Sequence, residues 1–263
     1  MPSKMLTRII TAVCVIAVVA FPIALGGMLM RILEIFIAVV GGYEISHMFD
    51  EKIHPAMIVM NVLAIGAVGL VPASYMPVVL AVWSAALFAM IIFDESKTAD
   101  MTAYSFIITV ILGLTIRTVD IFYFAENAMG WRAMLYVLLA AFVTDTGAYF
   151  FGVFFGKHKM IPRISPNKTW EGSVGGYFSG LIVSFVFGYF MLKELPVTLI
   201  GAGSVILPVI AQIGDLSYSA VKRRFGIKDF GNLLPGHGGV LDRIDSMTFC
   251  LIMFNALMIM WGM

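Results

Sequence analysis

The sequence predicts an all-α polytopic membrane protein of about nine transmembrane helices, with a polar site that faces the cytoplasm in its C-terminal half. Of its 263 residues, 60% are hydrophobic and only 13% are charged, whereas a soluble domain is about half apolar and about a quarter charged. The apolar residues also form long runs, near the ~20 residues that cross a bilayer core. With 17 Lys and Arg against 16 Asp and Glu, neither a disordered chain nor a nucleic-acid-binding protein is expected.

Nine apolar runs support the predicted helices. They cover residues 8–25, 28–48, 55–71, 76–93, 102–116, 132–150, 173–191, 197–218 and 247–261. The first run follows Lys4 and Arg8, as in a signal peptide, but it is long for one and no A-x-A cleavage site follows. We therefore expect it to be a retained membrane helix.

The distribution of Lys and Arg predicts the orientation, because positive residues are enriched on the cytoplasmic side. With nine spans, 13 of these residues fall on the side of the N-terminus and 4 on the other side. This places the N-terminus and the polar loops in the cytoplasm and the C-terminus outside. Nine of the 13 lie in two polar loops, so the orientation depends on those loops.

Residues 1–130 are expected to form a transmembrane scaffold, and 131–263 a transmembrane catalytic region, within one integral membrane domain. Glu34 and Glu44 stand out in the scaffold, because a carboxyl group at membrane depth is costly. Each either lines a site or has a structural role. Cys14 and Cys250 lie in apolar runs without the spacing of a metal site, so both are expected to pack as core residues.

Three carboxylates in the C-terminal half suggest a metal site. Asp215 lies near the end of one apolar run, and Asp242 and Asp245 lie three residues apart at the start of the next. If helical, the last two share a face. Carboxylates that converge in this way suit a hard cation such as Mg²⁺. Nearby are phosphate-binding residue types, at Lys222, Arg223, Arg224, Lys228 and Arg243.

A glycine-rich turn precedes these acids. Gly236, Gly238 and Gly239 allow backbone conformations that direct N–H groups toward an anion, and His237 either donates to a phosphate or has a structural role. The basic run alone would equally suit a patch that binds anionic lipid. Its combination with the acids and the turn favours phosphoryl or nucleotidyl transfer.

A second polar cluster extends from residue 144 to residue 172. Asp145 lies near the cytoplasmic end of an apolar run, and Lys168 follows a Ser-Pro-Asn turn just before the next run. Backbone N–H groups at the start of that helix would favour phosphate, with Ser165 and Thr169 as side-chain partners. Familiar nucleotide-binding motifs, the Walker A loop and GxGxxG, are absent from the sequence.

The order of these residues resembles the signature of CDP-diacylglycerol synthases. The resemblance is carried by Ser219-x-x-Lys222-Arg223, then Lys228-Asp229, then His237-Gly238-Gly239-x-x-Asp242-Arg243-x-Asp245. The stretches from Asp145 to Tyr149 and from Ser165 to Gly172 are also similar to that family, so the resemblance covers about 140–250. Residues 1–130 match only in being hydrophobic.

The resemblance implies a Mg²⁺-dependent nucleotidyltransferase of the bacterial cytoplasmic membrane, which makes CDP-diacylglycerol and pyrophosphate from CTP and phosphatidic acid for phospholipid synthesis. A phosphomonoester, with its second pKa at about 6, needs no strong general base at neutral pH. Asp215, Asp242 and Asp245 would hold the metal, with room for a second, monovalent cation. The basic side chains and Lys168 would neutralise phosphate charge, and Asp145 would help to close the site. A homodimer is a further expectation.

Two other classes remain open. A transporter also has intramembrane carboxylates, but its sites gather near the bilayer midplane, whereas these polar residues gather at one membrane face. Another lipid-headgroup enzyme, a CDP-alcohol phosphotransferase or a lipid kinase, is the second alternative. The former has an Asp-Gly start and a longer series of spaced aspartates that this sequence lacks.

Overall fold

The computed structural model describes residues 15, 17–49, 55–126 and 128–263. Two compact units divide the chain. The first contains residues up to Ile121 together with Phe225–Arg243, and the second contains Phe122–Arg224 and Ile244–Met263. The segment 225–243, which comes late in the sequence, therefore packs within the same unit as the N-terminal helices.

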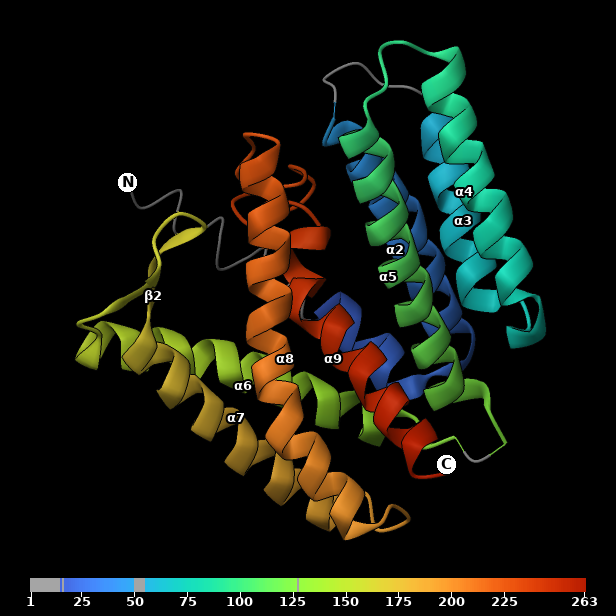
Figure 1. Cartoon of the computed structure of the whole chain (residues 1–263). Helices are drawn as coiled ribbons and strands as arrows, with labels where there is room; N and C mark the ends of the chain where they lie inside the picture. Colours follow the sequence, from blue (N-terminus) through green and yellow to red (C-terminus); the bar gives the residue numbers. More distant parts are fainter. Residues whose placement is uncertain (1–14, 16, 50–54, 127) are drawn as a thin grey trace. The chain divides into compact units, whose positions relative to one another are not determined.

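The first unit is helical. A helix that includes residues 17–25 ends where Gly26 adopts a positive φ of 64°. Four longer helices follow and lie side by side (Figure 1). They are α2 (Gly27–His47), α3 (Pro55–Leu70), α4 (Met76–Phe93), which follows the short 3₁₀ turn η1 (Ala73–Tyr75), and α5 (Ala99–Phe124).

Small residues let these helices approach closely, as is common in membrane bundles. A Cβ atom on Gly42 of α2 would lie 2.6 Å from the Val62 side chain of α3, and one on Gly69 of α3 would lie 2.9 Å from Ile116 of α5. Arg117 of α5 donates from Nε and Nη2 to the Val68 carbonyl, at 3.1 and 2.9 Å. This bond satisfies a carbonyl at the end of α3 that has no partner within the helix.

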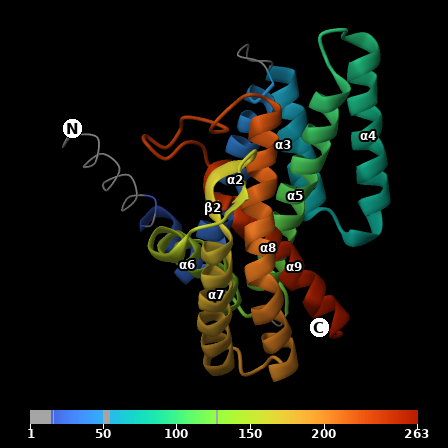
Figure 2. The same cartoon turned by 60° about the vertical axis from the view of Figure 1, so that its left-hand side comes forward.

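The second unit contains four long helices and a small sheet. These are α6 (Trp131–Phe155), β1 (Lys159–Ile161), β2 (Ser165–Thr169), α7 (Trp170–Met191), α8 (Val197–Arg224) and α9 (Leu241–Met260), the last of which begins in the first unit. The helices α7 and α8 lie side by side, and the hairpin of β1 and β2 joins α6 to α7 (Figure 2).

Glycine also determines the packing of α6 against α7. Gly172, Gly176, Gly180 and Gly188 are buried along one face of α7. A Cβ atom on Gly176 would lie 2.5 Å from the Thr144 carbonyl of α6, so a larger residue would force the two helices apart. In the core of this unit, the Tyr136 hydroxyl donates to the Ile200 carbonyl at 2.8 Å and lies 3.0 Å from Ser204 Oγ.

Six helices are long and apolar enough to cross a membrane, among the residues that the structure describes. They are Ala73–Phe93, Ala99–Phe124, Trp131–Phe155, Trp170–Met191, Val197–Arg224 and Leu241–Met260. Six of the nine predicted spans correspond to these helices. The helix α3 is apolar but has only 16 residues, and α2 includes Arg31, Glu34 and Glu44. The run at 8–25 lies partly outside the described residues, so the count of nine stays a prediction.

Two sequence predictions need correction. The chain is not purely α-helical, because β1 and β2 pair antiparallel, with Lys159 opposite Thr169 and Ile161 opposite Ser165. The Ser-Pro-Asn sequence therefore lies in a strand and not in a turn. In addition, α8 continues to Arg224, so Lys222 and Arg223 belong to the end of a helix and not to a loop. Cys250 is buried as expected, and Cys14 lies outside the described residues.

Candidate active site

Three carboxylates from three helices meet in the second unit. They are Asp145 of α6, Asp215 of α8 and Asp245 of α9, and they lie near enough for electrostatic repulsion between them. Ser246 holds two of them, because its hydroxyl donates to Asp145 at 2.9 Å and its N–H donates to Asp245 at 2.8 Å. The sequence predicted the importance of each acid, and the packing of α6, α8 and α9 brings them together.

Gly214 explains why α8 and α9 approach so closely at this point. A Cβ atom here would lie 2.9 Å from the Asp245 carbonyl and 3.1 Å from Ser246 Cα. The absence of a side chain at Gly214 thus lets the neighbouring Asp215 approach the start of α9. Sequence reasoning missed this residue, although its position directly before a candidate acid was a usable signal.

Lys168 supplies a positive charge to the carboxylates. Its Nζ forms an ion pair with Asp215, and the two side chains are 26% and 27% exposed. Ser219, one turn further along α8, donates to Asp215 at 3.4 Å. Because Lys168 lies in β2, the hairpin positions this cation.

Thr169, predicted to bind phosphate, has a structural role in this site. Its hydroxyl accepts a hydrogen bond from the Gly172 N–H at 3.2 Å and caps the N-terminus of α7. The side chain is buried, whereas Ser165 is half-buried at the other end of β2. A role for either hydroxyl in binding substrate stays a prediction.

The basic residues at the end of α8 differ in exposure. Lys222 is buried, whereas Arg223 is exposed and donates from Nε to the Ile164 carbonyl of the hairpin at 3.4 Å. Arg224 is also exposed.

The other predicted residues belong to the first unit, in the segment 225–243. Its glycine-rich loop is organised by Asp242, which is buried and accepts hydrogen bonds at Oδ2 from the N–H groups of Phe230 and Gly239, at 2.8 and 2.9 Å. Gly238 adopts φ of 85°, and a Cβ atom there would lie 2.9 Å from Asp242 Oδ2. Lys228, Asp229 and Arg243 are exposed in the same segment.

The loop corrects part of the anion-binding prediction. Gly236 and Gly238 have positive φ as expected, but Gly239 does not. The His237 N–H donates to the Leu234 carbonyl at 2.8 Å, and the Gly239 N–H donates to Asp242. Two of the expected backbone donors thus have acceptors within the loop, a backbone carbonyl for His237 and the buried Asp242 carboxylate for Gly239. The His237 Nδ1 atom is buried and has no hydrogen-bond partner among the described residues.

Glu44, whose role the sequence left open, has a structural role. Its two carboxylate oxygens accept hydrogen bonds from the N–H groups of Val240 and Leu241, both at 2.8 Å. These N–H groups have no partner within α9, so Glu44 caps the helix and its charge favours the N-terminus. Glu34 also has a partner, since its Oε2 lies 2.8 Å from Arg31, which in turn lies 2.6 Å from Asp120.

The chemistry of the second unit suits a hard cation, although the side chains do not enclose one. Among the described residues, no three His, Cys, Asp or Glu side chains are placed as they stand to hold a metal ion. Three carboxylates face two ammonium groups, because Lys168 pairs with Asp215 and Lys222 interacts with Asp245. This still leaves an excess of negative charge, carried by oxygen atoms that Mg²⁺ prefers.

Comparison with known proteins identifies the family. A sequence model of the cytidylyltransferase family matches residues 6–261. The chain belongs to the cytidylyltransferase family. This member is 37% identical to a phosphatidate cytidylyltransferase of Staphylococcus aureus (strain COL), over 96% of this chain and 99% of the relative. A Staphylococcus haemolyticus protein of the same name is 47% identical over 138 residues, covering 52% of this chain and 53% of the relative. Together with the six apolar helices, these findings make this cytidylyltransferase a multi-pass membrane protein.

Proposed function

We propose that this cytidylyltransferase makes CDP-diacylglycerol and pyrophosphate from CTP and phosphatidate. The family match and the relatives support this function. The observation that carries it is the carboxylate cluster of Asp145, Asp215 and Asp245, with Lys168 paired to Asp215. Carboxylates that can hold a divalent cation suit a reaction in which negatively charged phosphates must be brought together.

In the proposed reaction, a phosphate oxygen of phosphatidate attacks the α-phosphorus of CTP. The new P–O bond forms as the bond to the bridging oxygen breaks, and pyrophosphate leaves with that bond's electron pair. Because the attacking phosphomonoester is already largely ionised, the protein's main work is to position the two substrates and neutralise their charge.

Asp215 and Asp245, with Asp145 beside them, would hold Mg²⁺ in the second unit. A bound Mg²⁺ supplies positive charge that stabilises the triphosphate and its leaving group. Asp242 remains a proposed third ligand, and a second, monovalent cation also remains part of the proposal. Lys168, which pairs with Asp215, would neutralise charge on a substrate phosphate.

The remaining basic residues would bind the phosphates of the two substrates. Arg223 lies in the last turn of α8 beside the hairpin, and Lys222 lies one residue before it. Lys228, Arg243 and His237 would contribute from the loop that Asp242 organises. Ser165, Thr169 and Ser219 are proposed substrate-binding hydroxyls, and Gly236, Gly238 and Gly239 shape the loop with Asp229.

We place the protein in the bacterial cytoplasmic membrane as a homodimer, with the N-terminus and the site in the cytoplasm and the C-terminus outside. The loop that joins α6 to α7 contains Lys157, Lys159, Arg163 and Lys168, whereas the loop that joins α7 to α8 contains only Lys193. This asymmetry favours a cytoplasmic hairpin. Labelling of a cysteine at position 193 only from outside the cell would support this orientation, and labelling from the cytoplasm would contradict it.

The activity can be tested with purified protein in mixed micelles that contain labelled CTP, Mg²⁺ and phosphatidate. We expect pyrophosphate release that requires the lipid, stops with EDTA and returns with added Mg²⁺. Asp215→Asn should abolish it. Release without lipid, or none under any condition, would contradict the proposed function.

A further inference from the structure

We propose that the outer edge of the β1–β2 hairpin binds headgroups of anionic lipids in the membrane, and thereby gathers phosphatidate beside the carboxylate cluster. The second half of this statement rests on the proposed function, whereas the first half does not. The inference concerns Lys157, Lys159 and Arg163, which are not part of the proposed chemistry.

The hairpin carries an excess of positive charge. The stretch 146–171 contains four Lys and Arg residues and one acidic residue, Glu171, which pairs with His158. Lys168 is paired with Asp215, but Lys157, Lys159 and Arg163 are exposed and form no ion pair with any residue that the structure describes. Each such cation near an anionic membrane surface strengthens the attraction to anionic lipid.

Exposed aromatic residues place this charge at the membrane surface. Tyr149 and Phe154 in the last turns of α6 are 67% and 71% exposed, and Trp170 at the start of α7 is 54% exposed. Large aromatic side chains at the ends of apolar helices are typical of the boundary between lipid and water. The hairpin connects these two helix ends, so its cations lie at the level of lipid headgroups.

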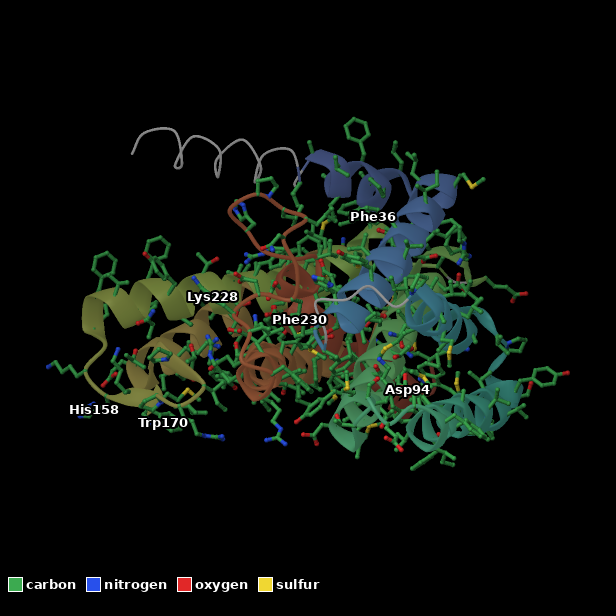
Figure 3. All side chains as sticks on the ribbon, turned by 90° about the horizontal axis from the view of Figure 1, so that it is seen from above. Phe36, Asp94, His158, Trp170, Lys228 and Phe230 are labelled. Atoms are coloured by element: carbon green, nitrogen blue, oxygen red, sulfur yellow. The ribbon has the colours of Figure 1, made fainter. Side chains whose placement is uncertain are left out.

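Hydrogen bonds hold the hairpin in place. The Trp170 N–H donates to the His158 carbonyl at 3.0 Å, and the two residues lie together at one end of the second unit (Figure 3). Glu171 accepts from the N–H groups of Lys157 and His158 at 3.1 and 3.2 Å. Because the backbone is already ordered, binding a headgroup costs little conformational entropy.

The same hairpin contacts the candidate site on its inner side. Lys168 pairs with Asp215, and the Ile164 carbonyl accepts from Arg223. An anionic lipid held at the outer edge would therefore lie next to the residues that are proposed to position it for the reaction with CTP.

Direct binding can be tested in nanodiscs by quenching of tryptophan fluorescence with brominated lipids. The difference between the full chain and Trp170→Phe isolates the signal of Trp170. We expect brominated phosphatidylglycerol to quench Trp170 at least about threefold more than brominated phosphatidylcholine at equal mole fraction. The variant Lys157→Gln/Lys159→Gln/Arg163→Gln should lose this excess and keep the quenching by phosphatidylcholine.

Lys193→Gln removes one exposed cation from a different loop and is the matched control for the single variant Arg163→Gln. This control should leave the excess quenching by brominated phosphatidylglycerol unchanged. Equal quenching by the two lipids in the wild-type chain would overturn the proposal. Loss of the excess quenching on addition of CTP would also overturn the proposal, because it would show that the three cations bind the free nucleotide. Phosphatidylglycerol is not the proposed substrate, so this result is independent of the enzymatic reaction.

Kinetics test the link to phosphatidate. The triple variant should have a KM for phosphatidate, expressed as mole fraction, at least about threefold higher at low salt, with kcat retained and the difference reduced at high salt because salt screens the attraction. A fall in kcat with KM unchanged would assign the three cations to the reaction itself and overturn the gathering role.

Discussion

Lys168 of β2 forms an ion pair with Asp215 of α8, 47 positions further along the sequence. This pair connects the hairpin to the helix that carries the candidate metal ligand. It also brings together two polar residues of the second unit that lie far apart in the sequence.

Substitution of Lys168 by Gln should reduce the rate of pyrophosphate release by about 10²–10³-fold, the typical effect of removing one charge-stabilising group from an active site. Thermal stability should change little, because a pair about one quarter exposed contributes at most about 1 kcal/mol. Lys193→Gln is the control and should retain activity. A rate near that of the wild type in Lys168→Gln would exclude Lys168 from the reaction.

Substitution of Gly214 by Ala should reduce activity and destabilise the second unit by about 1–3 kcal/mol, because the new Cβ atom would lie 2.9 Å from the Asp245 carbonyl. Gly201→Ala on the same helix is the matched control, since its Cβ atom would have no neighbour nearer than Phe185 at 3.9 Å. In measurements of thermal unfolding and turnover, Gly214→Ala should be less stable and less active than Gly201→Ala. Equal stability of the two would show that α8 and α9 are less tightly packed here.

Substitution of Asp242 by Asn should loosen the glycine-rich loop, because the carboxylate accepts two buried N–H bonds at one oxygen. Weakening these charge-assisted bonds should cost about 1–3 kcal/mol. Hydrogen exchange at the Phe230 and Gly239 amides should accelerate. If hydrogen exchange at these amides is unchanged in Asp242→Asn but activity is lost completely, Asp242 acts as a metal ligand and does not stabilise the loop.

Substitution of Glu44 by Gln should destabilise the start of α9 by about 0.5–2 kcal/mol, the usual range for loss of a helix cap. Faster hydrogen exchange is expected at the Val240 and Leu241 amides, whose N–H groups donate hydrogen bonds to the Glu44 carboxylate. Glu126→Gln provides a comparison outside this contact and should leave both amides unaffected. If the two amides exchange in Glu44→Gln at the wild-type rate, the side-chain amide oxygen of Gln is sufficient as a cap.

Much of the fold follows from local sequence. Apolar runs of about 20 residues form membrane helices because a helix satisfies all its backbone hydrogen bonds internally, and six of the predicted runs are such helices. The hairpin was not predictable in this way, since β1 has only three residues and the Ser-Pro-Asn sequence in β2 is typical of a turn. Pairing between the two short strands overcomes that local preference.

Composition, run length and motif order are enough to predict a membrane protein of the cytidylyltransferase family, because these features depend only on the chain. The sequence also identified Asp145, Lys168, Asp215 and Asp245 as candidates. Only the tertiary structure decided their partners: Lys168 pairs with Asp215, Ser246 holds Asp145 and Asp245, and Glu44 caps α9 from nearly 200 residues away. Such contacts depend on how closely helices pack, which is governed by glycines such as Gly214 whose effect appears only when two helices meet.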